Sequence, residues 1–220
     1  MMKFTSQLLS MRHLVLRRLT VFIGVFSLLC SSNIAYAELV PDCKILVLGD
    51  SVSAAYGMRQ HEGWVPLLQK EIADQATLIN ASVSGETTAG GLNRLPALLK
   101  EHQPHIVIIE LGGNDGLRGY PVPSIRKNLQ NLITLSSDAG AQVLLIGMKI
   151  PPNYGKPYTR AFEENYTLLA KENDLPLVPF LLESVAGNNE LMQSDGIHPT
   201  ANAQPLIVQN VLPSLRAMLD

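Results

Sequence analysis

The chain has 220 residues, a formal net charge of −2, 46% hydrophobic and 16% charged residues, and two cysteines. This length is sufficient for one domain with a sizeable core. No run of basic residues is present beyond the first 37 positions, which excludes a surface built to bind nucleic acid or an anionic membrane.

The first 37 residues have the features of a signal peptide. A basic segment precedes an apolar run at 19–30, and the small residues Ala35 and Ala37 stand where a signal peptidase cleaves. The apolar run is too short to span a bilayer, which needs about 20 residues. We expect cleavage after Ala37 and an exported mature chain, 38–220, that is periplasmic or secreted. Removing four basic residues takes the net charge to −6 and leaves only Cys43, so an intramolecular disulfide is excluded.

Beyond the leader, short apolar runs alternate with segments of helical period. The predicted strands are 44–49, 76–80, 105–112, 142–147 and 175–180. The predicted helices are 63–74, 91–102, 123–140, 160–173 and 201–219. Pro205 and Pro213 disfavour a continuous last helix. Continuous apolar strands between helices predict one three-layer α/β/α domain, 38–220, with a flavodoxin-like, mostly parallel five-stranded sheet and helices on both faces.

Polar and glycine-rich segments follow the carboxyl ends of these strands, where open α/β sheets carry their sites. "GDSVS" follows the first strand, with four apolar residues leading into it and a helix-compatible segment after it. "NASVSGETTAGG" and "LGGNDGLRGYP" follow the second and third strands, and "SDGIHPT" comes after the fifth. Each motif taken alone has an ordinary explanation as a turn, a helix cap or a loop.

Together the motifs contain every part of an acyl-transfer site. A serine hydroxyl such as that of Ser51 needs a base, which His198 can supply, and the imidazole needs a carboxylate such as that of Asp195, three residues earlier. The oxyanion of the tetrahedral intermediate needs preorganised donors. The backbone N–H groups of Ser51 and Gly85 and the side-chain amide of Asn114 come from neighbouring strand ends and can supply them.

The order and spacing of these motifs resemble the SGNH hydrolases, also called GDSL-type lipases and esterases. In that family four blocks contribute Ser, Gly, Asn and His in this order, and here they are "GDSVS", "NASVSGET", "GGND" and "DGIHP". The similarity extends to "RLPALLKEHQPHIVIIELGGNDGLRG" and is closest to the branch of small exported bacterial thioesterases, lysophospholipases and arylesterases. Val52 departs slightly, since many members have Leu there. The resemblance implies hydrolysis of acyl esters and thioesters through an acyl-enzyme on Ser51, without a metal or other cofactor.

Two other functions remain open at this stage. One is a carbohydrate deacetylase of the same family. The other is a non-catalytic, flavodoxin-like module in which "GDSVS" cradles a phosphate at a helix N-terminus. Asp195 and His198 favour the hydrolase, because a phosphate-binding loop has no use for them.

The remaining residues indicate no competing chemistry. His61, His102 and His105 have no acid three residues earlier, and we interpret them as structural or solvent-facing. No Cys or His cluster has metal-ligand spacing, and the Gly-rich loops lack a P-loop lysine. We expect a monomer that takes a small substrate with an apolar acyl chain, without nucleic acid and without stable membrane insertion of the mature chain.

Overall fold

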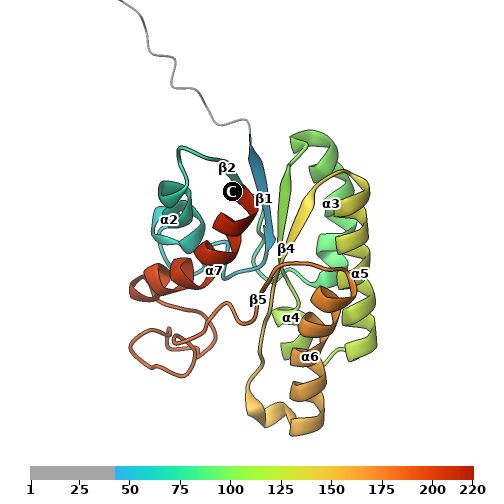
Figure 1. Cartoon of the computed structure of the whole chain (residues 1–220). Coiled ribbons are helices and arrows are strands. Elements are labelled where there is room, and N and C mark those ends of the chain that lie inside the picture. Colours follow the sequence, from blue (N-terminus) through green and yellow to red (C-terminus); the bar gives the residue numbers. More distant parts are fainter. Residues whose placement is uncertain (1–42) are drawn as a thin grey trace, which may run out of the picture. The chain divides into compact units, whose positions relative to one another are not determined.

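The computed structural model describes residues 43–220 (Figure 1). The expected leader, 1–37, lies outside the described residues. Among the helices within 43–220, none combines the length and the apolar character needed to cross a bilayer.

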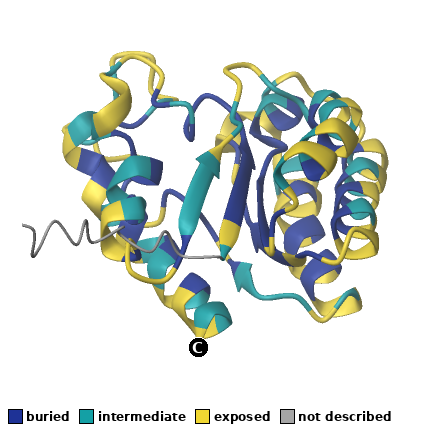
Figure 2. Cartoon of the chain, turned by 90° about the horizontal axis from the view of Figure 1, so that it is seen from above, coloured by how far each residue is buried: buried dark blue, intermediate teal, exposed yellow. Residues whose placement is uncertain are grey.

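Five parallel strands form the central sheet in the order β2-β1-β3-β4-β5. The strands are β1 (Lys44–Gly49), β2 (Thr77–Asn80), β3 (Ile106–Glu110), β4 (Gln142–Ile146) and β5 (Leu177–Val178). β1, β3 and β4 are almost entirely buried, whereas β2 is a half-buried edge strand (Figure 2). The predicted flavodoxin-like α/β fold is therefore confirmed.

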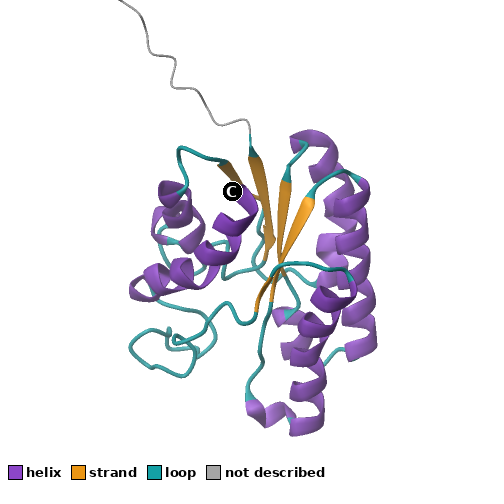
Figure 3. Ribbon diagram, in the orientation of Figure 1, coloured by secondary structure: helices purple, strands orange, loops and turns teal. Residues whose placement is uncertain are grey.

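Helices cover both faces of the sheet (Figures 1 and 3). One face carries α2 (Trp64–Glu71) and α7 (Gln204–Leu219). The other face carries α3 (Thr88–His102), α5 (Val122–Asp138) and α6 (Lys156–Glu172). The short helix α4 (Gly113–Leu117) follows β3, and the 3-10 turns η1, η2 and η3 span Gln60–Glu62, Pro152–Tyr154 and Ala201–Ala203.

Several predicted boundaries are wrong, and those of β5 and α3 have a clear local reason. β5 has two residues rather than six, and it lies between Pro176 and Pro179, which have no N–H group for a sheet ladder. α3 begins at Thr88, earlier than predicted, because the Thr87 hydroxyl caps it by accepting a hydrogen bond from Gly90 N at 3.2 Å. α6 also begins earlier, at Lys156.

The last helix is continuous, contrary to the effect expected of its prolines. Pro205 lies in its first turn, where the missing N–H group costs no helical bond. Pro213 lies inside α7, between the fully buried side chains of Val211 and Leu215. Packing of that apolar face against the sheet outweighs the lost backbone hydrogen bond.

Candidate active site

The proposed nucleophile lies directly after β1, in a series of turns. Residues 51–58, a segment whose sequence is compatible with a helix, form turns instead. Ala54 N donates to the Asp50 carbonyl and Tyr56 N to the Ser51 carbonyl, both at 3.0 Å. Ala55 has a left-handed φ of +58°, which turns the chain at this point.

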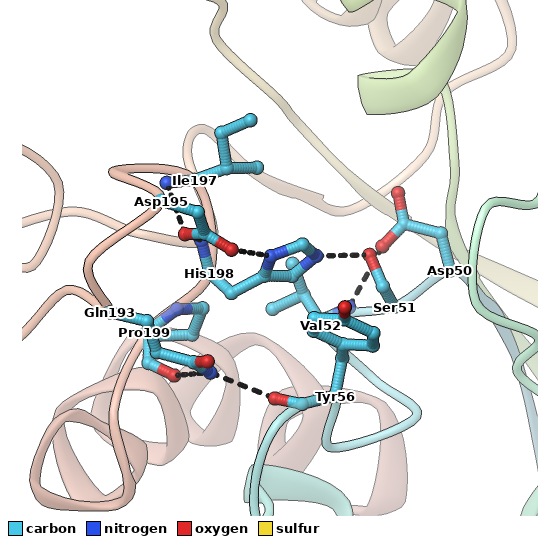
Figure 4. A network of polar contacts seen from close by, with 9 residues as sticks. All are labelled: Asp50, Ser51, Val52, Tyr56, Gln193, Asp195, Ile197, His198 and Pro199. Atoms are coloured by element: carbon cyan, nitrogen blue, oxygen red, sulfur yellow. Dashed lines mark hydrogen bonds and ion pairs between the residues drawn. The ribbon is translucent and has the colours of Figure 1, made fainter.

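Ser51, His198 and Asp195 form one chain of contacts (Figure 4). Ser51 Oγ lies 2.8 Å from His198 Nε2, although the two residues are 147 positions apart. On the other side of the ring, His198 Nδ1 lies 2.6 Å from Asp195 Oδ2. The imidazole therefore bridges a hydroxyl and a carboxylate, as a general base for serine requires.

The Asp195 carboxylate is held by its own turn. Its Oδ1 accepts hydrogen bonds from the backbone N–H groups of Ile197 and His198, at 2.9 and 3.0 Å. Partial burial disfavours the charge, but these amides and the His198 ring outweigh it and lower the pKa of Asp195 to about 2. Asp195 is therefore ionised near neutral pH, and its short turn fixes the orientation of the imidazole.

Asn114 lies on the same side of the sheet, in α4 after β3. Its Nδ2 donates to Asp50 Oδ2 at 3.0 Å, while Asp50 Oδ1 accepts from Val52 N at 3.0 Å. Burial raises the pKa of Asp50 to about 6, against the opposing effects of the Val52 amide, the His198 charge and the Asn114 amide. An amide nitrogen has two protons, so the bond to Asp50 orients the Asn114 amide and leaves its second proton available to another acceptor.

Gly85 lies before the N-terminus of α3, in a left-handed conformation with φ of +78°. Its carbonyl accepts a hydrogen bond from Arg118 Nη2 at 3.1 Å. Gly85 is not among the residues that line the cavity at Ser51, whereas Ser51, Asn114 and His198 line it. The structure thus brings four of the five predicted site residues, Ser51, Asn114, Asp195 and His198, into contact or into one cavity.

The cavity at Ser51 has a volume of about 520 Å³ and is mainly apolar. The cavity begins at the Asp50–Val52 segment, and the loops that follow β4 and β5 form its walls. Its apolar lining includes Leu117, Met148, Ile150, Phe180, Leu182 and Met192. A cavity of this character accommodates a hydrocarbon chain beside the Ser51 hydroxyl.

Sequence analysis does not identify three residues around this site. Glu110, the last residue of β3, is completely buried below the Ser51 turn, and its charge within an apolar strand is the signal that would have revealed it. The Tyr56 ring packs on the His198 imidazole, with ring centroids 4.4 Å apart. Gln193 donates to the Tyr56 carbonyl, a contact between distant segments that no local pattern predicts.

The other three histidines within residues 43–220 lie outside the site. His105 Nδ1 accepts a hydrogen bond from Lys44 N at 3.1 Å, at the amino end of the sheet. His102 ends α3 beside Glu101, and His61 is an exposed residue of η1. Within residues 43–220, no group of three or more His, Cys, Asp or Glu side chains is arranged to hold a metal ion.

Known proteins are similar to this chain in both sequence and fold. Residues 47–204 match the model of the GDSL-like lipase/acylhydrolase family. Esterase TesA of Pseudomonas aeruginosa is 50% identical over 178 residues, covering 80% of this chain and 89% of that protein. Thioesterase 1/protease 1/lysophospholipase L1 of Escherichia coli is 44% identical over 176 residues, covering 80% and 85%.

A solved structure agrees with these relatives. Esterase EstA from Pseudoalteromonas sp., inhibited by monoethylphosphonate, has 46% identity and a TM-score of 0.77, and the match covers 81% of this chain and 99% of that one. The resemblance inferred from the four sequence blocks is confirmed. The chain belongs to the GDSL-like lipase/acylhydrolase family.

Proposed function

We propose that this protein hydrolyses acyl esters and thioesters through an acyl-enzyme on Ser51. The observation that carries the proposal is the continuous contact from Asp195 through His198 to Ser51, with Ser51 and His198 lining an apolar cavity. The names of the relatives, an esterase and a thioesterase/lysophospholipase, support the same reaction class.

In the acylation step, His198 Nε2 takes the Ser51 hydroxyl proton as Oγ forms a bond to the substrate carbonyl carbon. The carbonyl π electrons move to oxygen and give the tetrahedral intermediate. When the intermediate collapses, the bond to the alcohol or thiol breaks and the imidazolium returns its proton to that leaving group. Asp195 stabilises the imidazolium throughout.

In the deacylation step, water replaces the departed alcohol or thiol. His198 takes a proton from the water as the water oxygen attacks the acyl carbon, and the Ser51 oxygen leaves with that proton. The products are a carboxylic acid and the free enzyme. Both steps use the same base in the same position.

We assign the oxyanion donors to Ser51 N, Gly85 N and Asn114 Nδ2. Asp50 supports the role of Asn114 because its carboxylate fixes the amide that must point at the developing charge. Gly85 is included because its motif supplies a backbone N–H at a neighbouring strand end; its left-handed φ of +78° and the Arg118 bond to its carbonyl hold the backbone on the other side of this N–H group.

The apolar cavity favours substrates with a hydrocarbon acyl chain over acetylated sugars, whose hydroxyl groups would find few partners there. The phosphate-binding alternative is disfavoured because the segment after Ser51 forms turns, so it offers no helix N-terminus to an anion. We further propose that the chain is exported through the leader at 1–37 and acts as a monomer. Mass measurement of the mature N-terminus and sedimentation would test these two points.

Labelling with a fluorophosphonate tests the central proposal. One probe per chain should bind the wild type and should be lost in Ser51→Ala, while Ser137→Ala, at an exposed position on α5, should label normally. A panel of p-nitrophenyl esters, acyl-CoAs, lysophosphatidylcholine and an acetylated sugar would then define the substrate class. Labelling retained in Ser51→Ala, or activity on the acetylated sugar alone, would contradict the proposal.

A further inference from the structure

Gln193 connects the loop that carries Ser51 to the loop that carries His198. Its side-chain nitrogen donates to the Tyr56 carbonyl at 2.8 Å and to the Pro199 carbonyl at 3.0 Å (Figure 4). Pro199 directly follows His198, and Tyr56 lies at the end of the turns that begin at Ser51. One amide group therefore uses its two protons to join the two loops.

The Gln193 side chain is held in place from both sides. In its own loop, Gln193 N donates to the His198 carbonyl at 2.7 Å, and Met192 pairs with Pro199 in an antiparallel bridge. In the serine loop, Gly57 has a left-handed φ of +75°. A Cβ atom at Gly57 would overlap Gln193 Oε1. Only glycine therefore allows the backbone to approach this amide so closely.

The same connection also determines where the Tyr56 ring lies. The ring packs against the His198 imidazole at a centroid distance of 4.4 Å and an interplanar angle of 36°. Tyr56 is half exposed, so the bond from Gln193 to its carbonyl is a main restraint on its position. A loop that moved at Tyr56 would shift the ring on one face of the base.

We propose that Gln193 is a positioning residue for acyl transfer, which holds the two loops at the separation that brings Ser51 Oγ to His198 Nε2. This inference rests on the proposed function. Gln193 does not line the cavity, so it is not expected to contact the substrate. Its loss should therefore slow proton transfer from Ser51 and leave substrate binding almost unchanged.

The test compares Gln193→Met with a matched glutamine elsewhere. Met keeps the side-chain length but cannot donate to either carbonyl. Gln69 likewise makes two backbone bonds, from Nε2 to the Ala76 carbonyl at 3.0 Å and from Leu78 N to its Oε1 at 2.6 Å. These bonds join α2 to the edge strand β2, so Gln69→Met controls for the general cost of losing such a contact.

In Gln193→Met, kcat should fall about ten- to a hundredfold, the cost of a misplaced reacting group, with KM changed by less than about threefold. The rate of fluorophosphonate labelling should fall by the same factor, while the final stoichiometry stays at one per chain. Gln69→Met should keep the wild-type kcat and labelling rate. A wild-type kcat in Gln193→Met, an effect on KM alone, or an equal loss of kcat in Gln69→Met would overturn the inference.

Gly57→Ala provides a second variant that acts from the other loop and covers the case in which Gln193→Met does not fold. The added methyl group displaces the Gln193 amide, so kcat should fall in the same way. Combining Gly57→Ala with Gln193→Met should cost little more than either change alone, because both remove the same connection. Additive losses would overturn the inference. Failure of the proposed function has a different result, since the wild type itself would then remain unlabelled.

Discussion

The Glu110 carboxyl group lies directly below the Ser51 turn and accepts a hydrogen bond from the Ser53 hydroxyl at 2.6 Å. The same oxygen, Oε2, accepts a hydrogen bond from Asp50 N at 3.1 Å. Asp50, just before Ser51, and Ser53, two residues after it, therefore share one acceptor. Oε1 is buried, and no residue of the described part of the chain bonds to it. Burial, and then the charge of Asp50, raise the pKa of Glu110 well above its ordinary value. We infer that a neutral carboxylic acid supports the nucleophile turn.

Glu110→Ala should destabilise the protein far more than Glu110→Gln. Gln keeps a carbonyl oxygen for Ser53 and Asp50, whereas Ala leaves two buried donors without a partner, at about 1–3 kcal/mol each. Urea unfolding at neutral pH measures both free energies. Equal stability of the two variants would show that the Glu110 carbonyl oxygen does not support the turn.

The pH dependence of stability should differ between the wild type and Glu110→Gln. A carboxyl group whose pKa is raised by folding stabilises the native state most fully below its unfolded pKa, and this contribution is lost as pH rises toward its folded value. Gln does not ionise, so Glu110→Gln does not lose this contribution. Above about pH 4.5, the unfolding free energy of the wild type should therefore fall relative to that of Glu110→Gln. Asp50, with its pKa raised to about 6, contributes a similar decline between about pH 4 and pH 6 in both proteins. Parallel curves of unfolding free energy against pH would contradict a neutral Glu110.

The three residues of the Ser51–His198–Asp195 chain should contribute unequally to the rate. Ser51→Ala and His198→Ala should each lower kcat by at least about a thousandfold, because nucleophile and base act as one unit. Asp195→Ala should retain about ten- to a hundredfold more activity than either, since the carboxylate only orients and stabilises the imidazole. Initial rates on p-nitrophenyl esters measure all three. Full activity in Asp195→Ala with an inactive His198→Ala would instead indicate a Ser–His dyad.

The sequence predicts the sheet and the grouping of Ser51, His198 and Asp195 because both depend on strong, simple signals. Runs such as 106–109 are apolar at every position, which is typical of a strand buried on both faces, and parallel strands bring their carboxyl-end loops together. Asp195 and His198 share one short turn, so their contact is also local. Ser51 joins them only because the fold brings β1 beside the segment after β5.

The features that the sequence does not predict depend on single long-range contacts. The N-terminus of α3 is fixed partly by Asp115, whose carboxylate accepts from Thr88 N at 2.9 Å and from the Thr88 hydroxyl at 2.7 Å. Helix α4 occupies a Gly-rich segment that local propensity assigns to a loop. No periodic pattern identifies Gln193 or Tyr56, because Gln193 contacts the distant Tyr56 carbonyl and the Tyr56 ring contacts the distant His198 ring.

Asn114→Ala should lower kcat by roughly a hundred- to a thousandfold, the effect of removing one preorganised oxyanion donor, with a smaller change in KM. Asn128→Ala is a suitable control, because its amide also makes a single side-chain bond, to the Thr88 hydroxyl at 3.0 Å, and does not line the cavity. Steady-state kinetics on one ester substrate distinguish the two. An effect of Asn114→Ala on KM alone would make Asn114 a substrate-positioning group.

Ala186→Trp should shorten the acyl chains that the enzyme accepts. Ala186 lies at an exposed position on the wall of the cavity, facing the space bounded by residues such as Leu182 and Met192, so an indole there occupies volume that a long chain would use. Each methylene that loses its place in an apolar pocket costs about 1–3 kcal/mol, so kcat/KM for long-chain p-nitrophenyl esters should fall about tenfold or more while the acetyl ester is unaffected. Ala161→Trp, at an exposed position on α6 away from the cavity lining, should leave the chain-length profile unchanged. If Ala186→Trp lowered kcat/KM equally for every chain length, the acyl chain would lie elsewhere, and the cavity would have a role other than binding it.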